Sequence, residues 1–279
     1  MGSSRKENGR RQRLHDIDTQ LEEAKSAYKA KKRALKEKRK AIRREWTPED
    51  QALRDAKRKA HREKREERRA LSEPPLRPLL EEIGCSVNHG AGAALSVVAL
   101  ILLLMKASGG VAIFSAIVYG GCLILMFLMS CLYHAFRAGS TVKRVWRRFD
   151  YCSIYLLIGG TITPILLLFV GGALGIVLCA VMWALIATGI TFVGVFGPMV
   201  MRGLHFALFF TIGWSAIVFL PRMWNTSPGL FWFILGGGLA YTLGMIPFVR
   251  KTRGAHFIWH FFVIAGAALQ WAGIWQYVF

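Results

Sequence analysis

The stretch Val111–Phe136, VAIFSAIVYGGCLILMFLMSCLYHAF, decides the fold of this chain. It contains no Lys, Arg, Asp or Glu, and it is longer than the roughly 20 apolar residues that a helix needs to cross a bilayer. Near its end it carries Ser130 and His134, which the helical period places on one face. A hydroxyl and an imidazole are costly at membrane depth unless they are paired or bind something. The stretch therefore predicts a membrane-spanning helix with a functional site near its end.

Six further apolar runs of similar length follow or precede this stretch. They predict an all-α membrane protein with seven transmembrane helices. The predicted spans are Cys85–Met105, Val111–Phe136, Phe149–Val170, Leu174–Phe196, Leu204–Leu220, Gly229–Val249 and Ala255–Val278.

Charge divides the chain into two unlike parts. The 279 residues carry 37 Lys and Arg against 17 Asp and Glu, a balance of +20. Residues 1–70 hold 25 of the basic and 13 of the acidic residues, so this part alone has a balance of 25 − 13 = +12. We expect a basic helical extension over 1–78 and a seven-helix transmembrane domain over 79–279.

The sequence of the basic extension, here called the basic arm, predicts two helices. A large apolar residue recurs every seven positions in its first part, at Leu14, Leu21, Tyr28, Leu35 and Ile42. Lys31 and Lys38 occupy intermediate positions of this seam, which argues against a stable coiled coil. Thr47 as N-cap and Pro48 at the first helical position predict a second helix over 48–70.

A strongly basic helical arm suits two kinds of partner. Basic helices bind the phosphate backbones of nucleic acids. Because this arm is attached to an apolar membrane part, anionic lipid headgroups are the nearer source of negative charge. We therefore expect an anionic membrane surface as its partner and no nucleic acid.

The loop charges predict the orientation of the spans. Basic residues follow the second, fourth and sixth spans and precede the first, whereas the alternate loops hold only Lys106 and Arg222. Lys and Arg favour the cytoplasmic side. The pattern predicts a cytoplasmic N-terminus and an outer C-terminus.

This orientation brings polar residues to one depth. Beyond Leu71 only four acidic residues occur, and of these Asp150 alone opens an apolar span. His134 at the end of the second span, Asp150 at the start of the third, and His256 and His260 at the start of the seventh all fall near the cytoplasmic side. His256 and His260 are one helical turn apart and share a face.

Three imidazoles with an open fourth position are typical of catalytic zinc. Zinc lowers the pKa of a bound water towards about 7. Asp150 is then placed to accept a proton from that water, and Ser130 to orient a ligand or stabilise an oxyanion. The set favours hydrolysis of an acyl or amide bond in a lipid.

Other candidate residues have plainer interpretations. His89 and His205 suit interfacial histidines, although His89, which follows Asn88 and the Glu81-Glu82 pair, also suits a supporting role beside the metal. The five cysteines show no Cys-x-x-Cys spacing, and they imply no disulfide framework. Cys131 and Cys152 lie near the constellation in sequence, but we expect them to pack as small apolar residues.

Four motifs together resemble the hemolysin III family. They are the segment EEIGCSVNHG over 81–90, the pair Ser130-x-x-x-His134, the segment FDYCSIYLLIGGTITP over 149–164, and the final His256-x-x-x-His260. This family belongs with the progestin and adipoQ receptors (PAQR), which have seven spans and a cytoplasmic N-terminus. The resemblance covers about residues 80–279. Two features depart from it: the pair Gly159-Gly160 and the basic arm.

The resemblance implies zinc held by His134, His256 and His260, with Asp150 and Ser130 near the zinc-bound water. The wider superfamily includes alkaline ceramidases and is thought to comprise membrane metal-dependent hydrolases. The compact loops look like the bacterial branch of the family, which implies the bacterial plasma membrane.

Three functions compete. The first is a zinc-dependent, ceramidase-like hydrolase of a lipid amide or ester. The second is a lipid- or ligand-sensing seven-span receptor in which zinc is structural, and a fully closed metal shell would favour it. The third is a hemolysin-like cytolysin, which the sequence supports least because no amphipathic pore-forming element accompanies the spans.

Overall fold

The computed structural model describes residues 2–44, 46–200, 202–250 and 252–279. All regular elements in this part of the chain are helices, as the sequence predicts. The helices form two compact units, Met1–Glu66 and Glu67–Phe279.

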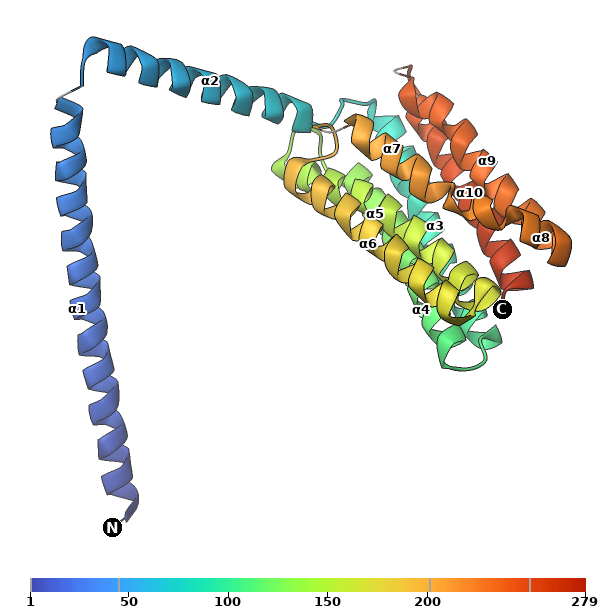
Figure 1. Cartoon of the computed structure of the whole chain (residues 1–279), viewed down its shortest axis with the longest axis horizontal. Coiled ribbons are helices and arrows are strands. Elements are labelled where there is room, and N and C mark those ends of the chain that lie inside the picture. The colour runs from blue at the N-terminus through green and yellow to red at the C-terminus, as the bar shows by residue number, and fades with distance from the viewer. Residues whose placement is uncertain (1, 45, 201, 251) are drawn as a thin grey trace. The chain divides into compact units, whose positions relative to one another are not determined.

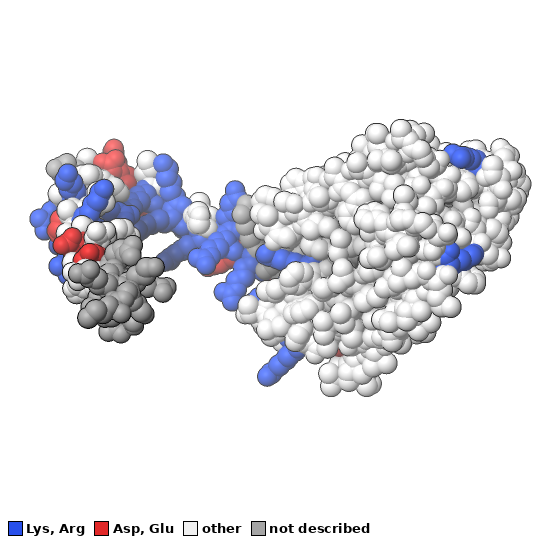
Figure 2. All heavy atoms as spheres, turned by 90° about the horizontal axis from the view of Figure 1, so that it is seen from below, with Lys and Arg blue, Asp and Glu red and all other residues white. Residues whose placement is uncertain are grey.

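The first unit is the basic arm. It contains α1 (Gly2–Arg44) and most of α2 (Pro48–Ser72). Thr47 caps α2 as predicted, because its hydroxyl accepts a hydrogen bond from the Asp50 amide at 3.2 Å and the Asp50 carboxylate accepts one from the Thr47 amide at 3.1 Å. This reciprocal pair satisfies two backbone donors at the helix start. Figure 2 shows the Lys and Arg side chains gathered on these helices and a broad uncharged face on the second unit.

The second unit carries the apolar helices. In the described part of the chain, seven helical stretches are long and apolar enough to cross a membrane, so the chain is a multi-pass membrane protein. Their elements, labelled in Figure 1, are α3 (Leu79–Lys106), α4 (Gly110–Ala135), α5 (Thr141–Pro164) with η1 (Ile165–Val170), α6 (Gly172–Phe196), α7 (Arg202–Gly213), η2 (Ser215–Phe219), α8 (Leu220–Thr226), α9 (Pro228–Val249) and α10 (Ala255–Tyr277).

The third span begins earlier than the predicted Phe149. Ser140 caps α5, its hydroxyl accepting a hydrogen bond from the Lys143 amide at 3.1 Å. The helix therefore includes a basic first stretch that hydropathy alone assigns to a loop.

The fifth span is broken where the sequence predicts one helix over Leu204–Leu220. α7 ends at Gly213, a short 3-10 segment follows, and α8 starts with Pro221 in its first turn. Proline has no amide hydrogen to donate to the preceding turn, so the α-helical ladder is interrupted there. The break places Trp214 beside α9, where its indole donates to the Thr242 hydroxyl at 3.2 Å.

Small residues let the central helix α5 approach its neighbours closely. A Cβ at Gly159 would lie 2.7 Å from Ile186 on α6, and one at Gly160 would lie 2.5 Å from Cys122 on α4. Small residues at helix interfaces are the usual means of close packing in membranes. The pair Gly159-Gly160 thus sets the spacing of three helices.

Helix pairing also determines which residues share an end of the bundle. α3, α4 and α5 pack in sequence order, α9 packs on α10, and α10 packs on α3 (Figure 1). Because α3, α5 and α10 start where α4 ends, their first turns meet the last turn of α4.

We expect the arm to bind anionic membranes. A peptide of residues 14–70 should bind vesicles containing anionic lipid at low salt, since each Lys or Arg near such a surface contributes about 1 kcal/mol. Binding should weaken as salt rises, because screening shortens the reach of these charges. Flotation with vesicles measures this, with neutral vesicles as the control. Equal binding to neutral vesicles, or tighter binding to RNA, would contradict it.

Candidate metal centre

Three histidines from two helices converge at one end of the second unit. His134 lies in the last turn of α4, and His256 and His260 lie in the first two turns of α10. The Nε2 atom of His256 is 3.3 Å from Nε2 of His134 and 3.3 Å from Nε2 of His260. The structure thus brings together the three histidines that the sequence singled out.

The spacing of these nitrogens fits a metal ion. Zinc–nitrogen bonds of about 2.0–2.1 Å in a tetrahedron place neighbouring nitrogens about 3.3–3.4 Å apart. The two observed separations of 3.3 Å match this value. The donor set is suitable for a metal ion on geometry and on chemistry, since imidazole is a common zinc ligand.

Glu82 holds His134 in the orientation that such a site requires. The Nδ1 of His134 is 2.7 Å from the Glu82 carboxylate, and both side chains are buried. An ionised carboxylate only accepts hydrogen bonds, so Nδ1 carries the proton and Nε2 presents its lone pair to the cluster. A carboxylate behind a ligating histidine is a recurrent arrangement in metal sites.

Lys143 extends this chain of contacts. Its ammonium group is 2.9 Å from the same Glu82 oxygen and donates to the Phe136 carbonyl at 3.0 Å. The sequence pattern counts Lys143 as a loop charge, but its side chain is fully buried. The pair neutralises Glu82, which would otherwise be an isolated charge in an apolar surrounding.

Cys85 is the fourth member of the cluster and the member that the sequence analysis missed. Its thiol and one ring nitrogen from each of His134, His256 and His260 all lie within 4.8 Å of one another. Cys131 and Cys152, which the sequence placed nearer to the constellation, lie outside this group and contact Ser86 and the Ile190 carbonyl, respectively. One signal could have found Cys85: it is three residues after Glu82, hence on the same helical face.

Asp150 and Ser130 lie on a cavity beside the histidines. The Asp150 carboxylate interacts with the Ser130 hydroxyl and with His134. Both residues line a cavity of about 730 Å³ whose wall also includes His256 and His260. The two predicted catalytic residues therefore share one space with two of the predicted ligands.

The lining of this cavity is basic. It includes four arginines, Arg77, Arg147, Arg250 and Arg253. Burial opposes the charge on Arg77, but the Tyr133 hydroxyl and the Glu82 carboxylate outweigh this effect, so the pKa of Arg77 lies above its ordinary value. The cavity is therefore suited to anionic groups.

The two remaining histidines of the second unit take different places. His89 is buried and stacks on His260, with ring centroids 3.8 Å apart and an interplanar angle of 26°. It thus supports the cluster and does not occupy an interfacial position. His205 is buried on α7, 3.3 Å from the Tyr155 hydroxyl, and is not part of the cluster.

We expect about one equivalent of metal per chain in purified protein, and loss of most of it in His256→Ala and His260→Ala. Removing a ligand should cost more than the roughly 10–100-fold in affinity that loss of a supporting partner costs. The melting temperature should fall as well, because metal binding stabilises the folded state. Elemental analysis and thermal melts measure both effects.

His205→Ala is the matched control, since it removes a buried histidine outside the cluster and should leave the metal content unchanged. Full metal retention in the double variant His256→Ala/His260→Ala would contradict the assignment.

Comparison with known proteins identifies the family of this chain. A family model described as "Haemolysin-III related" matches residues 79–271. The chain is 36% identical over 203 residues to "Hemolysin-3" of Bacillus cereus, a match that covers 71% of this chain and 92% of that protein. It is 34% identical over 193 residues to the "Hemolysin-3 homolog" of Bacillus subtilis (strain 168), covering 67% and 90%, respectively.

A human protein extends the likeness beyond bacteria. The chain is 30% identical over 173 residues to the "Monocyte to macrophage differentiation factor" of Homo sapiens, covering 59% of this chain and 71% of that protein. The family model and these relatives together show that the chain belongs to the hemolysin III family, within the progestin and adipoQ receptor superfamily.

Proposed function

We propose that this protein is a membrane-embedded, zinc-dependent hydrolase of a lipid amide or ester, acting at the cytoplasmic side of a bacterial plasma membrane. The observation that carries the proposal is that one cavity presents His256, His260, Asp150 and Ser130 together. A metal held only for stability requires neither a carboxylate nor a cavity beside it.

The histidines, Asp150 and Ser130 would each have a separate role in such a reaction. A zinc ion held by the histidines would lower the pKa of a water ligand towards about 7 and polarise the substrate carbonyl. Asp150 would accept a proton at its carboxylate and pass it to the leaving group. Ser130, next to Asp150, would donate its hydroxyl hydrogen to the oxyanion that develops on the carbonyl.

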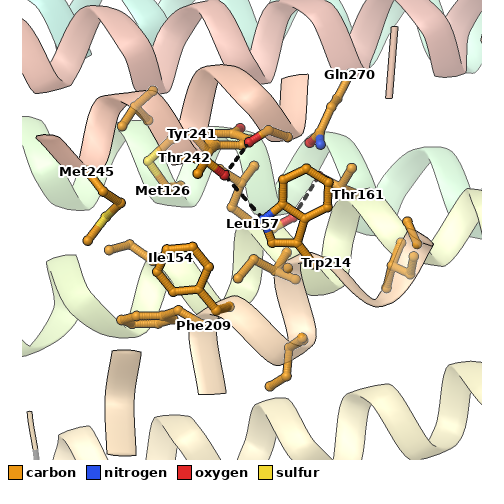
Figure 3. Close-up of a pocket in the computed structure, with 18 of the residues that line it drawn as sticks. Met126, Ile154, Leu157, Thr161, Phe209, Trp214, Tyr241, Thr242, Met245 and Gln270 are labelled. Carbon is orange, nitrogen blue, oxygen red and sulfur yellow. Dashed lines mark hydrogen bonds between the residues drawn. The ribbon is translucent and has the colours of Figure 1, made fainter. Parts of the chain in front are cut away.

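A second, apolar cavity supports a lipid substrate. It has a volume of about 160 Å³ and lies between α5, α7, η2, α9 and α10 (Figure 3). Trp214, held by its hydrogen bond to Thr242, forms part of its wall. The two cavities adjoin, because both are lined by Met126, Tyr151, Ile154, Phe206, Phe248, Trp259 and Val263. An acyl chain in the apolar cavity would bring its carbonyl towards the histidines.

The arginines of the larger cavity favour a lipid with an anionic head. Arg77, Arg250 and Arg253 line this cavity together with His256 and His260. Phosphate and carboxylate groups pair well with guanidinium groups. A lipid with an anionic headgroup would place its head in this cavity and its chain in the apolar cavity.

Sensing of a lipid with a structural metal is the second candidate function. The observation that favours it is Cys85, because a fourth protein ligand is typical of structural zinc. A cytolysin finds no such support in the geometry.

Incubation of purified protein with a lipid extract tests the proposal. Fatty acid should be released, the release should stop when a chelator removes the metal, and zinc should restore it. No release with fully metal-loaded protein would favour the sensing function.

Asp150→Asn should separate metal binding from hydrolysis. Three imidazoles still hold the metal in this variant, so metal content should stay unchanged while the hydrolysis rate falls by a factor on the order of 10²–10⁴. Asp55→Asn in α2 is the matched control and should change neither quantity. Loss of metal in Asp150→Asn would make Asp150 a ligand and contradict the role given to it.

Ala216→Phe should shift the preference of the enzyme towards shorter acyl chains. Ala216 lines the apolar cavity, and the larger side chain would fill part of it. Since one methylene in an apolar pocket changes selectivity about 10–200-fold, the long-to-short ratio of kcat/KM should fall at least about tenfold. Ile217→Phe, at an exposed neighbouring residue outside this cavity, should leave the ratio unchanged. An unchanged ratio in Ala216→Phe would mean that the acyl chain of the substrate binds outside this cavity.

A further inference from the structure

The cluster contains one donor that the proposed hydrolase does not use. Cys85 is fully buried on α3 and is a free cysteine. Its thiol lies within 4.8 Å of the ligating nitrogens of all three histidines. A small apolar packing residue would fill the same space without bringing a metal-binding atom to the cluster.

We propose that Cys85 is a fourth protein ligand, so that the centre is a Cys/His₃ site. The inference rests on the proposed function for the presence of a metal. Zinc–sulfur bonds are about 2.3 Å long and zinc–nitrogen bonds about 2.0–2.1 Å, so a tetrahedral shell places sulfur and nitrogen about 3.6 Å apart. The four donors lie within 4.8 Å of one another, and binding of one ion would draw them together. Cys131 and Cys152 contribute no atom to this group.

Cys85 lies apart from the wall of the large cavity. His256, His260, Ser130 and Asp150 line this cavity, whereas Cys85 does not. A Cys85 thiolate would therefore reach a bound ion from α3 and leave the cavity to the substrate. Catalytic zinc sites can expand to five ligands, so a thiolate ligand is compatible with hydrolysis.

A thiolate also selects among metals. Soft sulfur ligands favour zinc and cuprous copper, whereas magnesium, calcium and manganese favour oxygen. The donor set therefore predicts a centre that excludes these oxygen-preferring ions. The thiolate donates charge to the metal, so the centre is a weaker Lewis acid than a centre with three imidazoles and water.

Cobalt substitution of the full-length protein tests the inference. Wild-type protein loaded with Co²⁺ in detergent should show the near-ultraviolet charge-transfer band of a thiolate–cobalt bond. Cys85→Ser should lose this band and keep the visible absorption of cobalt held by the histidines. Cys131→Ser, the matched control, should keep both.

A charge-transfer band that persists in Cys85→Ser, or that is absent from cobalt-loaded wild type, would overturn the inference while the histidine site stands. A wild type that binds no cobalt and no zinc would overturn both the inference and the proposed function.

X-ray absorption of the zinc-loaded wild type provides a second measurement that needs no variant. A sulfur neighbour at about 2.3 Å, beside nitrogen or oxygen neighbours at about 2.0–2.1 Å, is expected. A zinc shell of nitrogen and oxygen alone would overturn the role of Cys85.

Discussion

The contact of Glu82 with His134 and Lys143 is the interaction on which the site depends. It joins three helices through three side chains, since Glu82 lies on α3, His134 on α4 and Lys143 on α5. Ionised groups are rare within membrane spans because leaving water is costly there, and they persist when they pair. Lys143 and His134 both contact the Oε2 atom of Glu82, so this buried carboxylate has two partners at one oxygen. This contact fixes the direction of the His134 Nε2, and α10 packing on α3 then brings His256 and His260 to meet it.

The rest of the bundle provides space next to that fixed point. Close packing at Gly159 and Gly160 holds α5 between α4 and α6, which keeps Asp150 beside Ser130. The interrupted fifth span packs less closely than α5. Its break around Trp214 borders an apolar cavity between α5, α7, η2, α9 and α10. The proposed binding of a lipid would use the polar end for its head and the apolar cavity for its chain.

Much of this architecture follows from the sequence, because the responsible signals are local. Apolar length predicts seven spans, Thr47-Pro48 predicts the start of α2, and the alternation of span direction places His134, Asp150, His256 and His260 at one end. The features that the sequence does not predict depend on contacts between helices that are distant in sequence. Ser140 is a typical N-cap residue, but nothing local to Lys143 indicates that the lysine turns inward to Glu82. Cys85 is not part of a Cys-x-x-Cys spacing, and the approach of α4 and α10 makes its sulfur a candidate ligand.

The central claim is that the Nε2 atoms of three histidines hold one metal ion, and anomalous diffraction tests it most directly. Data collected on both sides of the zinc absorption edge from crystals of the whole protein would locate zinc without reference to activity. We expect a single peak about 2.0–2.1 Å from the Nε2 atoms of His134, His256 and His260. Ordered histidines with no peak between them, or a zinc peak elsewhere in the bundle, would contradict the claim.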